Sequence, residues 1–371
     1  MRIVINCSNL RVGGGLQVAH SFLNEISQNK DHEFLVILSD TISIQIERKY
    51  FCENFRFITF SIKPSIYKAF SGKDAYLSSL EIEFNADVVF SVFGSTYWKP
   101  KAKHICGFAK PDYIYKESPY FNQINFFQKL KLAFIEFIHM FDFKNNNSLL
   151  ITENKDVANR LINRVSQKVV TVTNTFNQIF KDEKNWDKTL IIDSNNIDFK
   201  FLTISANYPH KNLKIIKSVI PILKKTYPDF RFKFYLSITA DDFEIEANDV
   251  LNENIQFLGK VNINQCPSLY EQCDFLFLPT LLECFSASYC EAMYMRLPIL
   301  TSDLSFAKGI CGNAASYFNP IDPADIANSI YNLATNKEIQ NHIIKNGDNQ
   351  LLTFDTSQTR AKKYLELITS H

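Results

Sequence analysis

Glu283 and Glu291 are the residues of this sequence best placed to do chemistry, because both follow a predicted buried strand. The apolar run Phe275–Leu278 has the length and composition of such a strand, and Pro279 ends it because proline has no amide hydrogen. Glu283 then falls in the connection and Glu291 one to two turns into a helix. Both carboxylates could face a ligand across the N-terminus of that helix. The alternative is that they serve only the helix dipole and solvent.

Lys211 is a second candidate. It lies in the turn Tyr208–Asn212, between the strand-like run Phe199–Ser205 and a predicted helix, Leu213–Lys225. An ammonium group at a helix start can add to the helix amides in holding a phosphate. A solvated surface charge is the alternative.

A glycine triplet, Gly13, Gly14 and Gly15, follows the first predicted strand, Arg2–Ile5, and opens a helix that runs to Ile26. Its amides could face an anion or a sugar. The spacing is not that of the dinucleotide fingerprint, since seven residues separate strand and triplet, and this argues against a nicotinamide-dependent oxidoreductase. A helix-entry turn without a ligand is the alternative.

Strand-like and helical patterns alternate through both halves of the chain, which predicts α/β architecture with doubly wound parallel sheets. The length of 371 residues favours two domains. We predict an N-terminal Rossmann-like domain over residues 1–178, a linker over 179–196, a second Rossmann-like domain over 197–352 and a closing helix within 353–371. Ligands in such folds bind beyond the carboxyl ends of strands, so the loops Gly94–Thr96 and Phe108–Pro111 are candidate acceptor-side loops.

Composition excludes several classes of function. Lys and Arg number 40 against 39 Asp and Glu, which gives no support to nucleic-acid binding. The histidines and cysteines show no metal-ligand spacing, so no protein-bound metal is expected. The eight cysteines form no C-x-x-C pair and are expected to be free, buried thiols of a reducing compartment. No apolar run approaches the roughly 20 residues of a spanning helix, so we expect a soluble or peripheral, cytoplasmic protein.

A run of aromatic residues falls at helical spacing between residues 113 and 143. Phe127, Leu130, Phe134, Phe137 and Phe141 share one helix face. Core packing is the favoured explanation. The alternative is an interfacial face, with lysines at positions 129 and 131, that touches a membrane or a lipid-linked acceptor.

At this point the chain resembles a known family. The run Glu283–Met293 has the pattern E-x-F-x-x-x-x-x-E-A-M and is followed by Pro298 and a strand. It resembles the signature of retaining, nucleotide-sugar-dependent glycosyltransferases of the GT-B fold, the family-4 type among glycosyl transferases group 1. The stretch Tyr208–Asn212 resembles the phosphate-contacting stretch of that family. The glycine triplet fits its N-terminal turn, and the last helix, with Tyr364, fits the helix that crosses back to the first domain.

The resemblance implies roles for particular residues. Glu291 would bind the ribose hydroxyls of the donor and Glu283 the transferred sugar, while Lys211 would neutralise charge developing on the leaving diphosphate. The residues that would offer backbone amides to the diphosphate are Phe285, Ser286, Ala287 and Ser288. The family needs no cofactor, since the nucleoside-diphosphate sugar is itself the donor substrate, and it has no agreed protein nucleophile.

The implied function is a hexosyltransferase that moves a sugar onto a saccharide or lipid-linked saccharide with retention of configuration. Bacterial surface polysaccharide assembly, of O-antigen or capsule, is the expected context, and the inner face of the plasma membrane is one location in the cytoplasm that fits it. Two alternatives stay open: a non-catalytic sugar-nucleotide-binding protein, and a sugar-nucleotide epimerase or phosphorylase on the same fold.

The sequence departs from the family pattern at four places. Ala206 stands where many members have an arginine beside the phosphates, and Ser286 replaces a glycine near the donor. Arg296 replaces the glycine that usually ends the helix, so either a non-glycine residue adopts a left-handed conformation or the helix ends differently. No counterpart is found for an N-terminal-domain histidine near the sugar, because His104 is predicted to precede its strand.

Overall fold

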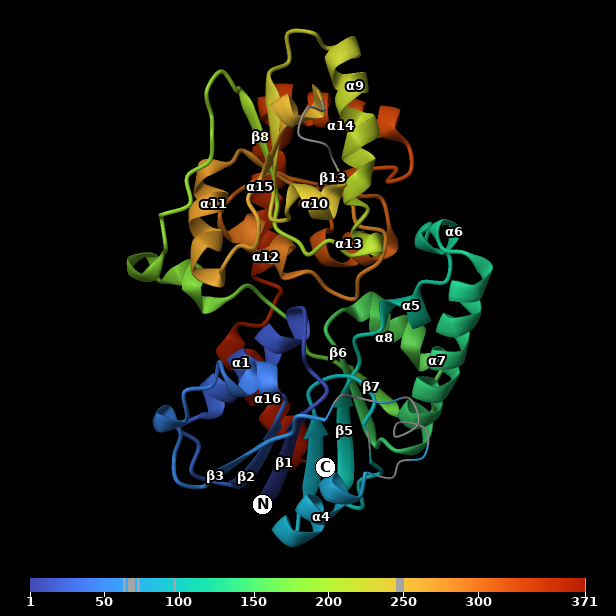
Figure 1. The fold of residues 1–371 in the computed structure, drawn as a ribbon. Helices are drawn as coiled ribbons and strands as arrows, with labels where there is room; N and C mark the ends of the chain where they lie inside the picture. Colours follow the sequence, from blue (N-terminus) through green and yellow to red (C-terminus); the bar gives the residue numbers. More distant parts are fainter. Residues whose placement is uncertain (63–64, 66–70, 72–73, 97, 245–249, 371) are drawn as a thin grey trace. The chain divides into compact units, whose positions relative to one another are not determined.

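The computed structural model describes residues 1–62, 65, 71, 74–96, 98–244 and 250–370. The chain divides into two compact units (Figure 1). Unit 1 comprises residues 1–116, 121–174 and 355–371, and unit 2 comprises 117–120 and 175–354. In this division the residues predicted as a linker, 179–196, lie in unit 2.

Unit 1 is built on a seven-stranded parallel sheet with the strand order β3-β2-β1-β4-β5-β6-β7. Its strands are β1 (Arg2–Cys7), β2 (Glu33–Leu38), β3 (Phe55–Thr59), β4 (Val88–Ser91), β5 (Lys103–Gly107), β6 (Leu149–Thr152) and β7 (Lys168–Thr171). Its helices are α1 (Gly14–Ile26), α2 (Asp40–Ser43), η1 (Arg48–Tyr50), α4 (Ala75–Phe84), α5 (Pro111–Ile114), α7 (Phe126–Asn145), α8 (Lys155–Ile162) and α16 (Ser357–Thr369). The short helix α6 (Tyr120–Gln123) begins in unit 2 and ends in unit 1.

Both faces of the unit 1 sheet are buried. Ile3 and Ile5 of β1 pack in one apolar cluster with α1 and α16, whereas Val4 packs in another with α4 and α7. This alternation is expected because successive side chains of a strand point to opposite faces. Tyr364 of α16 lies with its ring centre 5.4 Å from the rings of Phe22 and Phe90, so the last helix completes the first unit's core.

Unit 2 contains a six-stranded parallel sheet with the order β10-β9-β8-β11-β12-β13. Its strands are β8 (Phe199–Thr203), β9 (Phe232–Leu236), β10 (Ile255–Phe257), β11 (Phe275–Leu278), β12 (Ile299–Ser302) and β13 (Ser316–Phe318). Its α-helices are α9 (Ile216–Thr226), α10 (Ala240–Phe243), α11 (Cys266–Gln272), α12 (Ala287–Tyr294), α13 (Ser305–Cys311), α14 (Pro323–Thr335) and α15 (Lys337–Leu351). Its 3₁₀ helices are η2 (Gln178–Lys181), η3 (Glu183–Asn185), η4 (Pro209–Lys211), η5 (Leu213–Ile215), η6 (Val250–Asn254) and η7 (Ile263–Gln265). The predicted α/β architecture with two parallel sheets is therefore confirmed.

The prediction that the aromatic face of α7 packs in the core is wrong. All five of its residues are exposed, with fractions between 48% for Phe141 and 79% for Phe127. The helix instead uses its opposite side for packing, where Ile138, Met140 and Phe143 are buried. Helical spacing identified the face correctly but could not tell which of two apolar faces meets the sheet.

Other predictions concern membranes, metals and cysteines. Across the parts of the chain that the structure describes, no helix combines the length and apolarity needed to cross a membrane. Over the same residues, no three His, Cys, Asp or Glu side chains gather as metal ligands would. Seven of the eight cysteines are buried, in keeping with their apolar sequence context.

Candidate active site

The sheet of unit 2 has a switch point between β8 and β11. From β8 the chain proceeds outward through β9 and β10 on one side, and β11 to β13 extend the other side. Connections from adjacent strands leave in opposite directions there, which opens a crevice at the carboxyl ends of the strands. Lys211 ends η4, just beyond β8, and Glu283 lies just beyond β11.

Lys211 and Glu283 form an ion pair at this switch point. Their side chains are only 18% and 13% exposed, so solvent screens the pair less than it screens a surface pair. The two loops are also joined through the backbone, since the Leu281 amide donates to the His210 carbonyl at 2.7 Å. Two residues chosen separately from the sequence thus meet in the structure.

Helix α12 begins at Ala287, directly after the loop that carries Glu283. Ser286 is its N-cap, in an extended conformation (φ −123°) that any residue adopts, so no glycine is required there. The first amides of a helix have no carbonyl one turn earlier to bind, and they carry the positive end of the helix dipole. Phe285, Ser286, Ala287 and Ser288 are all half-buried, so this end of the helix remains accessible to a ligand.

Glu291 lies in the second turn of α12 and is buried. The hydroxyl of Tyr270, on α11, donates to its Oε2 at 2.8 Å. Burial raises the pKa of Glu291 to about 7, although the Tyr270 hydrogen bond favours the ionised form. Glu291 is therefore a buried carboxyl group that changes its charge near neutral pH.

Arg296 ends this segment in a left-handed conformation, with φ of 58°. The Arg296 amide donates to the Met293 carbonyl at 3.2 Å, and the Leu297 amide donates to the Ala292 carbonyl at 2.9 Å. These bonds satisfy the last carbonyls of α12. Of the two possibilities raised by the missing glycine, the non-glycine residue adopts the left-handed conformation.

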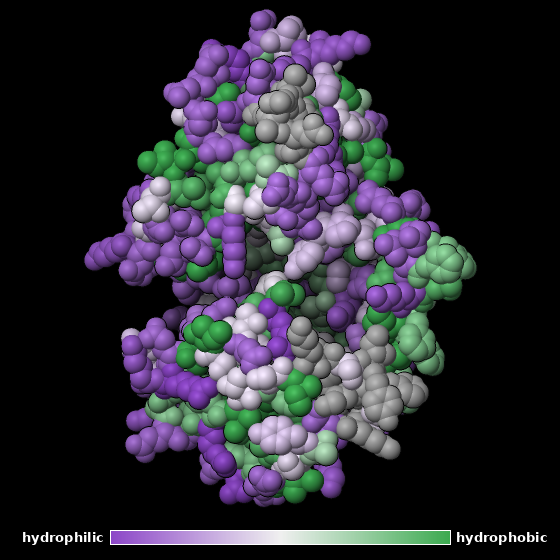
Figure 2. Space-filling model, in the orientation of Figure 1, coloured by the Kyte–Doolittle hydropathy of each residue, from purple (hydrophilic) through white to green (hydrophobic). Residues whose placement is uncertain are grey.

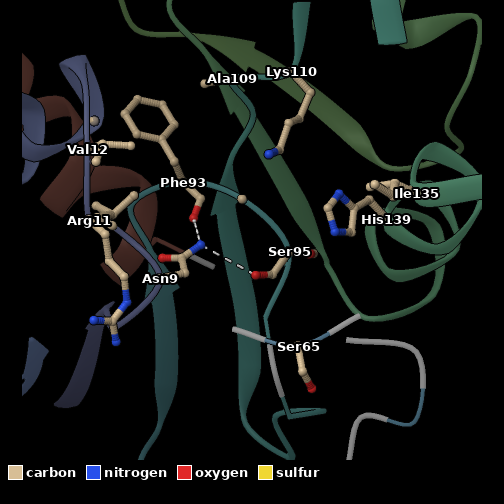
Figure 3. A pocket seen from close by; sticks show the side chains of 13 residues that line it. Asn9, Arg11, Val12, Ser65, Phe93, Ser95, Ala109, Lys110, Ile135 and His139 are labelled. Carbon is tan, nitrogen blue, oxygen red and sulfur yellow. Dashed lines mark hydrogen bonds between the residues drawn. The ribbon is translucent and has the colours of Figure 1, made fainter. Parts of the chain in front are cut away.

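Unit 1 has its own switch point, between β1 and β4, and a pocket of about 540 Å³ lies beside it (Figure 3). Its lining residues come from the loops after β1, β4 and β5, from helices α1 and α7, and from position 65. They are Asn9, Leu10, Arg11, Val12, Gly15, Ser65, Phe93, Gly94, Ser95, Ala109, Lys110, Ile135 and His139. Both candidate acceptor-side loops contribute to the lining. Of the glycine triplet, Gly15 lines the pocket, whereas Gly13 is the N-cap of α1 with φ of 78° and Gly14 is its first residue.

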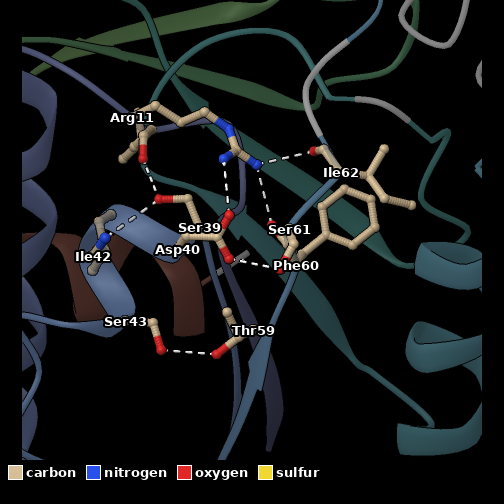
Figure 4. Close-up of polar contacts among 10 residues, drawn as sticks. Arg11, Ser39, Asp40, Ile42, Ser43, Thr59, Phe60, Ser61 and Ile62 are labelled. Atoms are coloured by element: carbon tan, nitrogen blue, oxygen red, sulfur yellow. Dashed lines mark hydrogen bonds and ion pairs between the residues drawn. The ribbon is translucent and has the colours of Figure 1, made fainter.

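Hydrogen bonds fix the loop after β1. The Asn9 Nδ2 donates to the Phe93 carbonyl at 2.6 Å, and Gly94 beside it has φ of 84° and leaves no room for a Cβ atom. The Arg11 guanidinium donates to Asp40 and to the carbonyls of Phe60 and Ile62 (Figure 4). Hydrogen bonds therefore hold the loop after β1 to the loop after β4 through Asn9, and to the loop after β3 through Arg11.

His139 is a pocket residue that the sequence analysis missed. It points into the pocket from α7 (Figure 3), and its Nδ1 lies 2.7 Å from the Tyr113 hydroxyl. Burial, helped by the charge of Lys110, lowers the pKa of His139 to about 4, so its ring is neutral at pH 7. In the tautomer in which Tyr113 donates to Nδ1, the Nε2 carries the proton and donates to a ligand; in the other tautomer the Nε2 accepts.

His104, which was predicted to precede its strand, lies inside β5 and is buried. Its Nε2 is 2.9 Å from the Ser91 hydroxyl, and its Nδ1 is 2.9 Å from the Asn146 carbonyl. His104 therefore links β5 to β4 and to the loop after α7 through hydrogen bonds, and it does not line the pocket. No signal in the local sequence marked His139, which lies four residues after Ile135 on a side of α7 away from the aromatic face.

The pocket's charge is one-sided. Among the described residues, its lining includes two cations, Arg11 and Lys110, and no carboxylate. Arg11 is engaged by Asp40, whereas the ammonium of Lys110 projects toward the interior (Figure 3). Amide, hydroxyl and imidazole groups supply the remaining polar contacts. This lining suits a ligand that combines hydroxyl groups with a negative charge.

Comparison with known proteins agrees with this geometry. Residues 182–350 match the family model described as Glycosyl transferases group 1. No curated protein sequence matches the chain. Solved structures match over nearly the whole length, among them sucrose-phosphate synthase from Thermosynechococcus elongatus, with a TM-score of 0.73, 12% identity and coverage of 99% of this chain and 97% of that one.

Two further structures are similar. HepE of Anabaena, solved in complex with UDP and glucose, matches with a TM-score of 0.68 and 15% identity over 100% of this chain and 99% of that one. WaaG, a glycosyltransferase involved in lipopolysaccharide biosynthesis, matches with a TM-score of 0.70 and 13% identity over 100% of both chains. At such low identities these likenesses are of fold, and the fold is GT-B.

Proposed function

We propose that the chain is a glycosyltransferase of group 1 that transfers a hexose from a nucleoside-diphosphate sugar, with retention of configuration; the family match over residues 182–350 and the GT-B fold support this proposal. The single observation that supports the proposal most is the Lys211–Glu283 pair, at the switch point of unit 2 and next to the start of α12. An ammonium group, helix amides and a carboxylate within one short region provide partners for both a diphosphate and a sugar.

In the proposed donor complex, Glu291 accepts hydrogen bonds from the ribose hydroxyls. A carboxylate with two oxygens suits a vicinal diol, and Tyr270 already holds one of these oxygens in position. The amides at Phe285–Ser288 bind the diphosphate. A diphosphate near Lys211 competes with Glu283 for the ammonium group, and this competition frees the Glu283 carboxylate for the hydroxyls of the transferred sugar.

The reaction breaks the bond between the sugar and the phosphate, so negative charge grows on the leaving diphosphate. Lys211 and the amides of α12 are fixed partners for that charge, which is how preorganised groups lower a barrier. We assign no protein nucleophile and no catalytic base. The leaving phosphate itself accepts the proton of an acceptor hydroxyl that attacks from the same face.

The unit 1 pocket is the proposed acceptor site. A saccharide would use Asn9, Ser95 and His139, and Lys110 favours an acceptor that carries a negative group near the reacting hydroxyl. A lipid-linked saccharide meets this description through its phosphate groups. We accordingly propose a role in bacterial surface polysaccharide assembly, at the inner face of the plasma membrane.

A thermal-shift screen against nucleoside diphosphates and nucleotide sugars tests the donor assignment. Nucleotides that carry one particular base should raise the melting temperature at millimolar concentration, since a ligand at 100 times its Kd adds about 2.7 kcal/mol of stability. Glu291→Ala should abolish the shift, and the exposed Glu271→Ala should retain it. Stabilisation by no nucleotide would overturn the proposal, and an inverted anomeric centre in the NMR spectrum of the product would overturn the retaining mechanism.

A further inference from the structure

Helix α7 carries the most extensive exposed apolar side among the described helices. Its outer face, as we call it, consists of Phe127, Leu130, Phe134, Phe137 and Phe141, and Phe126 beside it is also exposed. Green atoms gather along this helix at the right of Figure 2. Scattered exposed apolar residues are normal on a protein, but a contiguous patch marks an interaction surface.

The spacing of these residues makes one stripe. Steps of three and four residues keep them within about 100° of each other around the helix axis, and a 20-residue helix extends about 30 Å. Aromatic rings at such a stripe can enter the boundary between headgroups and acyl chains.

The exposed charges on α7 are all positive. Lys129, Lys131 and Lys144 are exposed and lie to either side of the stripe. The helix has two acidic residues, and neither is open to an outside partner. Glu136 is paired with Lys116 and Arg164, and buried Asp142 accepts from the Thr96 amide and the Asn146 side chain.

A groove of about 370 Å³ runs beside the outer face. Its lining combines apolar residues of α7 with Lys144 and with the ion pair between Glu136 and Arg164. The residues are Ala133, Glu136, Phe137, Met140, Phe141, Lys144 and Arg164. The apolar residues of this lining suit an acyl chain, and Lys144 supplies a cation for an anionic headgroup.

We infer that the outer face of α7 docks on a membrane surface that contains anionic lipids, with the aromatic stripe in the interfacial region and the lysines on the headgroups. The charged residues of α7 exclude a spanning orientation. A second copy of the chain fits less well, because it would bring lysines against lysines.

The inference deepens the proposed function, on which it rests for the nature of the acceptor. The same helix lines the unit 1 pocket through Ile135 and His139, on a side that faces away from the stripe. A membrane bound to the outer face would therefore lie one helix diameter from the pocket. A lipid-linked acceptor could then reach the pocket without leaving the bilayer surface.

Vesicle flotation of the full chain tests the inference. The protein should float with vesicles of phosphatidylcholine and phosphatidylglycerol and much less with phosphatidylcholine alone. Added salt should weaken binding. Phe127→Ser/Phe134→Ser/Phe137→Ser should lower the bound fraction at least tenfold. Lys129→Gln/Lys131→Gln should lower the partition coefficient by about fivefold per lysine. The matched control is Ile44→Ser/Ile191→Ser/Leu352→Ser, whose residues are as a set more exposed than the three phenylalanines, and it should float like the original protein.

Absence of flotation by the original protein, or unchanged flotation of both α7 variants, overturns the inference. Light scattering that shows a dimer lost in the α7 variants would assign the face to self-association instead. Nucleotide-induced thermal shifts, measured on the same proteins, separate the two proposals. Intact shifts without flotation refute membrane docking alone, and flotation without any nucleotide shift refutes the donor assignment alone.

Discussion

The two switch points of the molecule are built by the same topology but equipped in opposite ways. At the unit 2 switch point, opposite charges are paired and partly shielded, with Lys211 against Glu283 and a buried Glu291 nearby. At the unit 1 switch point a pocket is lined by neutral donors and acceptors with one inward-pointing cation. In the proposed function, the charges of the unit 2 switch point suit the binding of a diphosphate. The mostly neutral lining of the unit 1 pocket suits the recognition of an acceptor, whose structure varies from one enzyme to another.

The largest expected effect comes from the charged switch point. Lys211→Ala should lower kcat by about 100- to 1,000-fold, because charge on the leaving diphosphate loses its fixed cation. The matched control is Lys214→Ala. Lys214 lies three residues after Lys211, and its exposed ammonium group is paired with Glu244. Steady-state rates and a melting curve for each variant make the measurement. If Lys211→Ala turns over at the original rate while folded, the comparison between the two switch points fails.

Glu291 should make stability depend on pH. Its pKa of about 7 in the folded protein lies above the ordinary glutamate pKa of 4.5, so the folded state holds a proton that the unfolded state releases. The free energy of unfolding should therefore fall as pH rises from about 4.5 to about 7, by up to about 3 kcal/mol. Glu291→Gln should remove this share of the pH dependence in urea titrations.

Glu153 provides the control for that experiment. It is buried in unit 1, and burial raises its pKa to about 7 as well. Glu153→Gln should remove a similar share of the pH dependence and leave nucleotide binding unchanged, whereas Glu291→Gln should weaken nucleotide binding. Equal nucleotide binding by both variants would show that Glu291 is a structural carboxyl group only.

Removing a charge from the unit 1 pocket should change the KM for the acceptor and leave the KM for the donor unchanged. Lys110→Met should raise the KM for an anionic acceptor by about tenfold, the typical value of one charge-assisted hydrogen bond. The KM for the donor should stay the same. Lys155→Met, at an exposed position in the first turn of α8, is the control. A rise in donor KM for Lys110→Met would mean that the pocket serves the donor instead.

The smallest expected effect concerns the end of α12. Arg296→Gly should raise the free energy of unfolding by less than about 1 kcal/mol, because glycine adopts the left-handed conformation without strain. The variant also loses the exposed ion pair with Asp348, which Asp348→Asn tests separately. Catalytic rates should not change. A loss of activity would show that Arg296 has a role in the donor site beyond ending the helix.

The residues of the unit 2 switch point were easier to predict from the sequence than those of the unit 1 pocket, because their positions follow from the positions of buried strands. The strand Phe275–Leu278 was predicted to the residue, because buried parallel strands are short apolar runs. Lys211, Glu283 and Glu291 lie in the loops and the helix that come next after such strands, so strand prediction located them. The short edge strand Ser316–Phe318 was missed, since three residues give no pattern.

The unit 1 pocket draws on several separate segments, and His139 reaches it from the middle of a long helix. Nothing in the local sequence distinguishes such a residue from a packed or solvated histidine. The same limit explains α7, where aromatic spacing predicted a packed face and the structure shows an exposed one. Periodicity identifies which residues share a face, but tertiary packing decides what that face meets.

Helix α16 has a consequence for co-translational folding. Ala361, Tyr364 and Ile368 belong to the apolar cluster of unit 1, yet they are translated after all of unit 2. The apolar core of unit 1 is therefore complete only after α16 has been translated. Folding of this chain cannot finish strictly from its amino terminus onward, and a nascent chain arrested before residue 357 lacks the last piece of its first domain.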